Sequence, residues 1–194
     1  MKQNKSKLSL RCLTEGAVFV GLAQVLGYLK LFELPQGGSI TVAMLPIFIY
    51  CARWGFGPGI LASFVYSLLQ LTLDGAYAWG WQSMLGDYIV AFTVLGVAGL
   101  FHKQRYGFFT GTAVGSAARF LVHYVVGATV WAEYMPEKFF GMTMHSPWFY
   151  SLLYNGSYMV IDMALCLLVG ALLWKPMGKY LRGEDLPGRF KKMP

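Results

Sequence analysis

The sequence predicts an all-α integral membrane protein, a bundle of six transmembrane helices. Of its 194 residues, 56% are hydrophobic and only 13% are charged, whereas a soluble domain has about 25% charged residues. The mean hydropathy is +0.49. Apolar runs recur along the chain, bounded by charges or by Gly and Pro clusters, and a spanning helix needs roughly 20 such residues. We expect a single membrane domain over residues 1–194.

The six predicted spans cover residues 10–29, 40–52, 55–73, 81–101, 107–131 and 148–174. The first carries Glu15 and has no small-x-small cleavage site before Tyr28, so we expect a helix rather than a signal peptide. The second is short. It must thin the bilayer, let Arg53 snorkel to the surface, or lie partly inside the bundle. The other four approach or exceed the length that a span requires.

Basic residues predict the orientation. With the N-terminus inside, Lys30 and Lys138 are the only basic residues outside, and Arg119 lies within a span. This distribution obeys the positive-inside rule and places both termini in the cytoplasm. It also accounts for the net charge of +7 without a nucleic-acid partner. The basic tail after Trp174 is expected to meet anionic lipid headgroups. The predicted cytoplasmic set is Lys2, Lys5, Lys7, Arg11, Arg53, Lys103, Arg105, Lys175, Lys179, Arg182, Arg189, Lys191 and Lys192.

Several kinds of chemistry have no motif here. Three cysteines, an odd number in a reducing compartment and without a CxxC pair, indicate apolar packing rather than disulfides or a metal site. The chain has no GxxxxGK[ST] loop, no HExxH pair and no GxSxG elbow. We therefore predict no catalytic residues, no metal and no ATP hydrolysis. The absence of inverted repeats argues against a self-contained secondary transporter.

Polar and aromatic residues in the outer third of three spans predict a binding pocket. An ionisable group inside a span is costly, so it faces the protein interior or a wet cavity. Asp87, His123 and Asn155 lie at similar depths, with Trp131 and Tyr150 near the outer rim. An acid, an imidazole, an amide and aromatic rings suit a flat, nitrogen-rich small molecule that enters from outside.

Each of these residues also has a structural explanation. Trp131 suits an aromatic belt about as well as a pocket, and Gly127 leaves room for either a ligand or a neighbouring helix. Asn155 could join helices, and a pair between Asp87 and His123 could be structural. Tyr150 precedes Asn155 by five residues, so the two do not share a helix face.

Two further features lie outside the predicted pocket. Arg119 and Asp162 both fall near mid-membrane, which favours a buried ion pair between the fifth and sixth spans. In the first span, Ala17 and Gly21 are small residues four positions apart. They allow close contact with a helix, either within this bundle or on another membrane protein.

Four groups of residues carry a family resemblance: 38–41 with 44–46, 85–88 with 91–92, 119–124 with 127, and 150–159. Together they resemble the thiamine-specific substrate-binding subunit (S-component) of energy-coupling-factor (ECF) transporters. The resemblance runs from about residue 8 to about residue 175. The string Tyr-Ser-Leu-Leu-Tyr-Asn-Gly-Ser-Tyr-Met is its most specific part.

This resemblance implies a six-helix, multi-pass protein of the prokaryotic plasma membrane that binds thiamine in an outward pocket. A shared membrane subunit and two ATPase subunits would power release, docking on the small-residue face of the first helix at Ala17 and Gly21. Asp87 would hydrogen-bond the aminopyrimidine and Trp131 would stack on the ligand. The implied site is completed by His123, Tyr150 and Asn155, with Tyr77 and Tyr88 as secondary members.

The sequence departs from the family pattern at several positions. Asp87 is shorter than the Glu of some relatives, and Ile89 stands where many have proline. The first outer loop, residues 30–38, has no Trp to act as a lid, a place that Phe32 could take. Alternative functions are an S-component for a thiamine precursor or another vitamin, a structural scaffold, or an intramembrane enzyme with Asp87 and His123 as acid and base, which lacks a nucleophile or metal set.

Overall fold

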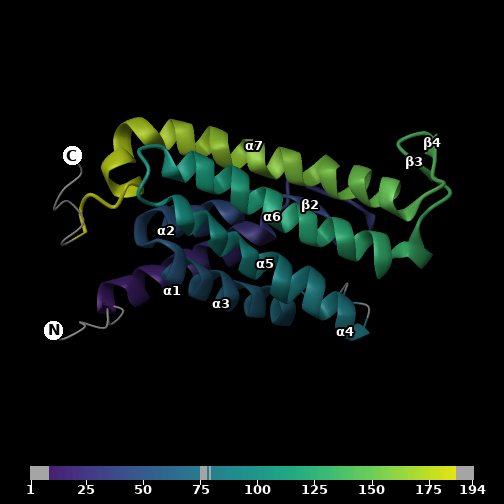
Figure 1. Cartoon of the computed structure of the whole chain (residues 1–194), viewed down its shortest axis with the longest axis horizontal. Helices are drawn as coiled ribbons and strands as arrows, with labels where there is room; N and C mark the ends of the chain where they lie inside the picture. Colours follow the sequence, from purple (N-terminus) through teal and green to yellow (C-terminus); the bar gives the residue numbers. More distant parts are fainter. Residues whose placement is uncertain (1–8, 75–77, 79, 187–194) are drawn as a thin grey trace.

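The computed structural model describes residues 9–74, 78 and 80–186. Its helices pass back and forth along one long axis, so that α1 begins and α7 ends at the same end of the molecule (Figure 1). The fourth pass is a composite of α4, the π-helical segment η3, α5 and the 3-10 segment η4. The helical elements are α1 (Leu10–Tyr28), α2 (Met44–Trp54), α3 (Phe56–Asp74), α4 (Gly80–Ser83), η3 (Met84–Val90), α5 (Ala91–Thr93), η4 (Val94–Phe101), α6 (Gly107–Thr129) and α7 (Pro147–Leu181).

Short elements join the helices. Between α1 and α2, strands β1 (Phe32–Glu33) and β2 (Ser39–Ile40) pair antiparallel around the 3-10 turn η1 (Pro35–Gly37). After α6 come η5 (Ala132–Tyr134) and a second antiparallel pair, β3 (Lys138–Phe139) and β4 (Met142–Thr143). The second pair lies at the end opposite the start of α1 (Figure 1).

The predicted six-helix membrane bundle is confirmed in its number and order of passes. Four of the described helical passes are long and apolar enough to cross a membrane: α1, α3, the pass over Gly80–Phe101, and α7. The helices differ from the predicted spans at two boundaries. The second helix begins at Met44 rather than at residue 40, because the preceding residues pair in β2, and α7 continues to Leu181, beyond the predicted end at residue 174.

Helix α2 is short because it lies inside the bundle. Nine of its eleven residues are buried, so of the three alternatives for this span the interior position is the one observed. Gly55 makes the tight turn into α3. Its φ of 85° is a conformation that side chains rarely adopt, and its N–H donates to the carbonyl of Cys51 at 2.8 Å.

Charged side chains from α1, from α2 and from the segment after α7 meet at the end where α1 begins, here called the basic end. Arg53, only 5% exposed, donates to Glu15 at 2.9 and 3.1 Å and to Asp185 at 3.0 and 3.2 Å. Arg11 also binds both carboxylates, and the Trp54 indole donates to Glu15 at 2.8 Å. Arg53 therefore does not snorkel to the surface. It ties α2 to α1 and to the segment after α7.

The same network sets the charge state of Asp185. Partial burial acts to raise the pKa of this carboxyl, but the hydrogen bonds from Arg53 and Arg11 outweigh it, so its pKa is lowered. A lowered pKa in the folded state contributes stability above the ordinary carboxyl range, and that contribution is lost as the pH falls through the lowered value.

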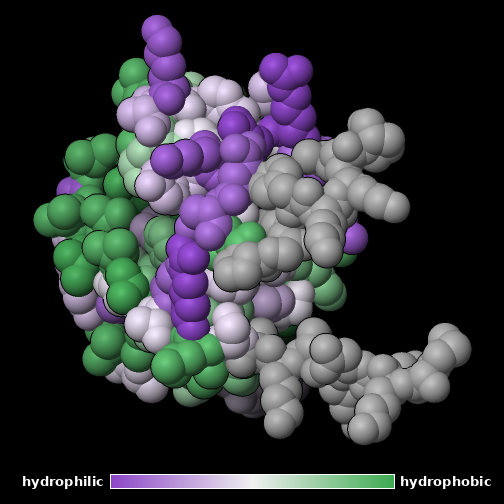
Figure 2. All heavy atoms as spheres, turned by 90° about the vertical axis from the view of Figure 1, so that its left-hand side faces the viewer, coloured by the Kyte–Doolittle hydropathy of each residue, from purple (hydrophilic) through white to green (hydrophobic). Residues whose placement is uncertain are grey.

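Figure 2 views the basic end directly. Hydrophilic residues cross its centre, whereas hydrophobic residues line the left-hand rim of the bundle. Exposed apolar side chains on the flanks include Val18 and Leu22 of α1, Leu61 and Val65 of α3, and Leu168 and Leu172 of α7. A polar end and apolar flanks are the distribution expected of a protein that crosses a bilayer.

Arg53→Met should lower the stability of the detergent-solubilised protein. Removing one partner of a buried ion pair costs about 3–5 kcal/mol, because the remaining charge is left uncompensated. Thermal unfolding should show a large drop for Arg53→Met and little change for Lys103→Met, a control whose side chain is exposed. An equal, small effect of both changes would mean that the network does not hold the basic end together.

Candidate functional site

An internal cavity lies between the connection from α1 to α2, the fourth pass, α6 and α7. Six of the predicted site residues line it, and Tyr77 lies outside the described residues. The cavity wall also contains residues that the sequence did not indicate, from the segment before α2 and from α3. The six are Asp87, Tyr88, His123, Trp131, Tyr150 and Asn155.

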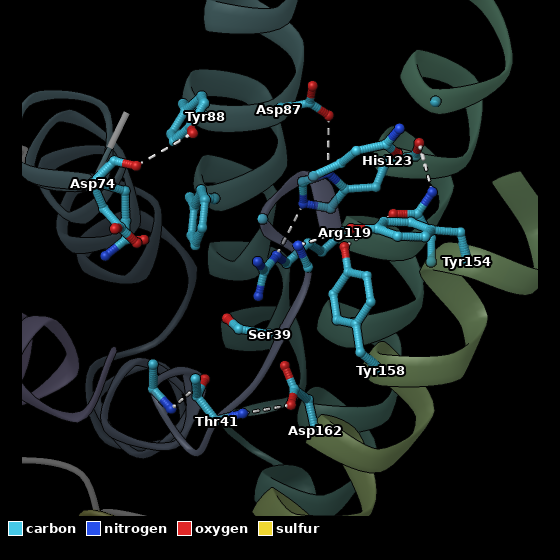
Figure 3. A pocket seen from close by; sticks show the side chains of 18 of the residues that line it. Ser39, Thr41, Asp74, Asp87, Tyr88, Arg119, His123, Tyr154, Tyr158 and Asp162 are labelled. Atoms are coloured by element: carbon cyan, nitrogen blue, oxygen red, sulfur yellow. Dashed lines mark hydrogen bonds and ion pairs between the residues drawn. The ribbon is translucent and has the colours of Figure 1, made fainter. Parts of the chain in front are cut away.

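The Asp87 carboxylate is the centre of this site (Figure 3). Its Oδ1 lies 3.0 Å from Nδ1 of His123, while its Oδ2 accepts hydrogen bonds from Ser83 at 2.9 Å and from the Trp131 indole at 2.8 Å. Asp87 belongs to the π-helical segment η3. Such segments are rare and frequently mark functional sites. A carboxylate offers about four acceptor positions, so three protein donors leave roughly one for a ligand.

His123 is oriented from its other side by Arg119, one turn earlier on α6. Nε of Arg119 donates to Nε2 of His123 at 3.3 Å. Because Arg119 has only donors, Nε2 must be the accepting nitrogen and Nδ1 must carry the hydrogen. The imidazole is then a donor toward Asp87. The sequence left open whether these two residues pair, and the structure shows that they do.

The predicted ion pair between Arg119 and Asp162 was wrong. Within the described part of the chain, no ion pair joins them. The Arg119 guanidinium lies over the ring of Phe92, 4.2 Å from its centroid, and Asp162 accepts the backbone N–H of Thr41 at 2.8 Å. Both side chains line the cavity instead. Similar depth on neighbouring helices was not enough to bring them into contact.

Asn155 joins helices and also borders the cavity. Its amide donates to the carbonyls of His123 and Ser151 at 3.3 and 3.1 Å, and its Oδ1 accepts from Tyr158 at 2.9 Å. Gly127 on α6 permits this contact, since a Cβ there would lie 2.5 Å from Oγ of Ser151. The space at Gly127 therefore receives the neighbouring helix, although its backbone still borders the cavity.

The connection between α1 and α2 closes one side of the cavity. Tyr150 donates to the Gln36 side chain at 2.9 Å, and Tyr154 donates to the carbonyl of Pro35 while accepting the N–H of Gly38. A Cβ at Gly38 would lie 2.8 Å from the Tyr154 oxygen, so only glycine fits. Tyr150 reaches the cavity here despite facing differently from Asn155.

Phe32, which the sequence offered as a substitute for a lid aromatic, stays untested in that role. Phe32 is 59% exposed and does not border the cavity, because it sits on strand β1, facing outward, while the turn that follows covers the site. Trp81 and Trp148 are also exposed. Tyr88 does border the cavity, and its hydroxyl donates to the carbonyl of Asp74 at 3.4 Å.

Some of the missed residues had a signal in the sequence. Tyr154 and Tyr158 continue the four-residue spacing of Tyr150, which places the three along one side of α7. Ser83 precedes Asp87 by four residues, a spacing at which side chains on a helix meet. Gln36 had no such signal, because its position depends on the path of an irregular loop.

The arrangement suits recognition rather than reaction. The cavity offers a carboxylate acceptor, an imidazole, an indole and several phenols, so it can bind a planar heterocycle that carries amino groups. The fold and the site thus define a helical membrane protein with an internal binding cavity for a small molecule.

Comparison with known proteins identifies the family. Residues 13–181 match the model of the thiamine transporter protein family (Thia_YuaJ). The thiamine transporter ThiT of Bacillus subtilis (strain 168) is 30% identical over 93% of this chain and 98% of its own length. The ThiT of Lacticaseibacillus paracasei is 28% identical over 89% of this chain and 90% of its own. The chain belongs to the thiamine transporter family.

Two solved structures share the fold. ThiT from Listeria monocytogenes superposes with a TM-score of 0.78 at 24% identity, covering 89% of this chain and 97% of that one. The S component of a bacterial ECF transporter superposes with a TM-score of 0.60 at 15% identity, covering 88% of this chain and 97% of its own.

Asp87→Asn should weaken ligand binding about ten- to a hundredfold. The change keeps the shape but replaces charged hydrogen bonds, worth about 1.5–3 kcal/mol, and places an amide N–H₂ where one of the two oxygens accepted hydrogen bonds. A binding titration of the purified protein measures the effect. Glu133→Gln, which neutralises an exposed acid in η5, is the matched control. Equal affinities for both variants would remove Asp87 from the site.

Proposed function

We propose that this chain is the thiamine-binding S-component of an ECF-type vitamin importer in the prokaryotic plasma membrane. One observation carries the proposal: a chain of the thiamine transporter family encloses a cavity around a carboxylate that three protein donors hold in place. Thiamine carries an aminopyrimidine, which needs an acceptor of this kind, and flat rings that suit aromatic walls. Transport rather than catalysis agrees with the family.

The side of the membrane from which the ligand enters is inferred from the distribution of basic residues. The exposed basic residues Lys103, Arg105, Lys175 and Lys179 belong to the basic end, where α1 begins. The positive-inside rule places that end in the cytoplasm. The cavity then lies toward the outer face, covered by the turn at Gln36 and by the loop before α7. Thiamine would enter from outside, and release to the cytoplasm would require a separate source of energy.

The energy source is proposed to be a coupling membrane subunit with two ATPase subunits, because this chain has no phosphate-binding loop of its own. Helix α1 offers a docking surface for the coupling subunit. Ala17 and Gly21 lie on its exposed side, and a Cβ at Gly21 would meet nothing within 4 Å. The buried side of α1 carries other residues, such as Gly16 and Val20, so Ala17 and Gly21 do not pack this bundle.

Thiamine should quench the tryptophan fluorescence of the purified protein through Trp131. Trp131→Ala should lose most of the quenching and about five- to thirtyfold in affinity, since a desolvated stacking or cation–π contact is worth about 1–2 kcal/mol. Trp131→Phe should keep part of each.

Trp174→Phe is the control for this titration, because Trp174 packs on Tyr106 and Phe109 away from the cavity. Quenching that disappears in Trp174→Phe but persists in Trp131→Phe would misplace the site. No binding of thiamine by the wild-type protein would refute the proposed function, and a titration with its pyrimidine moiety would then test a precursor.

Replacing both Ala17 and Gly21 with Trp should abolish thiamine uptake in cells that supply the energising subunits, while binding by the purified protein stays near the wild-type value. Bulky side chains would keep a partner helix at a distance, and membrane helices associate through close packing. Leu61→Trp with Val65→Trp, an exposed pair at the same spacing on α3, is the matched control. Uptake that survives the α1 double change would contradict docking at this surface.

A further inference from the structure

A second carboxylate, that of Asp162, borders the same cavity at its inner end. Asp162 is only 1% exposed and lies near the middle of α7. Its Oδ1 accepts the N–H of Thr41 at 2.8 Å, and among the described residues no hydrogen bond reaches its Oδ2. Figure 3 shows the carboxylate directed from α7 toward the space below Tyr158. Asp162 lines the cavity, so this oxygen can accept a hydrogen bond from a ligand that binds there.

Arg119 contributes the opposite charge to the same cavity. Its Nε donates a hydrogen bond to His123, and its guanidinium lies over the Phe92 ring. Its two terminal nitrogens make no hydrogen bond to the described residues. Arg119 and Asp162 thus face one cavity without forming an ion pair. A group placed near both must donate to a carboxylate and accept from a guanidinium. A hydroxyl does both.

The neighbouring hydroxyls of Tyr158 and Thr41 are already hydrogen-bonded within the protein, and an uncharged hydroxyl is a weaker acceptor than the Asp162 carboxylate. The hydroxyl of Tyr158 already donates to Asn155 at 2.9 Å, and the hydroxyl of Thr41 accepts the N–H of Ala43. Asp162 follows Asn155 by seven residues, which is about 10 Å along a helix. That separation is comparable to the length of a molecule built from two linked heterocycles with a short side arm.

We propose that Asp162 and Arg119 form an inner subsite that binds the primary hydroxyl of the ligand, at the opposite pole from Asp87. This inference rests on the proposed function, in which Asp87 takes the aminopyrimidine and the hydroxyethyl arm of thiamine remains to be placed. The subsite recognises the ligand in its free alcohol form. A phosphate ester would lose the donated hydrogen and set its negative charge against Asp162, with only Arg119 to compensate.

The test compares three ligands on the wild type and on Asp162→Asn: thiamine, an analogue with ethyl in place of hydroxyethyl, and thiamine monophosphate. Asn keeps an oxygen for the N–H of Thr41, so the loop contact is preserved. Asp162→Asn should weaken thiamine binding about tenfold, the difference between a charged and a neutral hydrogen bond. Binding of the ethyl analogue should change less than about twofold, and the preference for thiamine over its monophosphate should fall about tenfold or more.

Equal losses for thiamine and the ethyl analogue would overturn the proposal, because Asp162 would then act only through Thr41. Wild-type protein that binds the ethyl analogue as tightly as thiamine would also overturn it, and this measurement needs no variant should Asp162→Asn fail to fold. Glu133→Gln serves as the exposed control. Wild-type protein that binds none of the three ligands would instead refute the proposed function, so the two failures are distinguishable.

Discussion

The hydrogen bonding of the Asp87 carboxylate is the interaction on which the site depends. A carboxylate within a membrane span is tolerated only where the protein solvates it. Ser83, His123 and Trp131 provide this solvation from α4, from α6 and from the residues that follow α6. Because the three donors come from different elements, they draw those elements together around one point. The cavity lies beside the Asp87 carboxylate, which the three donors hold in a fixed orientation as an acceptor for the ligand.

The charged side chains are arranged differently at the basic end and in the cavity. At the basic end, Arg53 is buried and meets two carboxylates, Glu15 and Asp185. Each charge there has an opposite partner, which is what a structural connection requires. In the cavity, Arg119 and Asp162 are close enough to share one space yet do not pair. Charges kept apart in this way remain available to a ligand. This contrast indicates that the charges of the basic end stabilise the fold, whereas those of the cavity serve binding.

Irregular backbone makes room for the cavity. The π-helical segment η3 interrupts the fourth pass where Asp87 faces α6. Helix α2 begins only at Met44, so the residues before it, Ser39 and Thr41 among them, can line the cavity rather than continue a helix. In a membrane such segments are tolerated only where protein or a cavity surrounds them and where their N–H groups find acceptors. Asp162 is the acceptor for the backbone N–H of Thr41.

The sequence by itself determined the membrane class, the six passes and the residues around which the site is built. These follow from local properties: the length of apolar runs, and the cost of placing Asp87, His123 or Asn155 among them. The resemblance of residues 150–159 to S-components added the ligand class. The tertiary structure decided which polar groups meet. It paired Asp87 with His123, separated Arg119 from Asp162, buried Arg53 and turned Phe32 outward. Those outcomes depend on the rotation of each helix about its axis and on the path of the loop through Gln36. Both are set by packing between segments distant in the chain, so no local pattern encodes them.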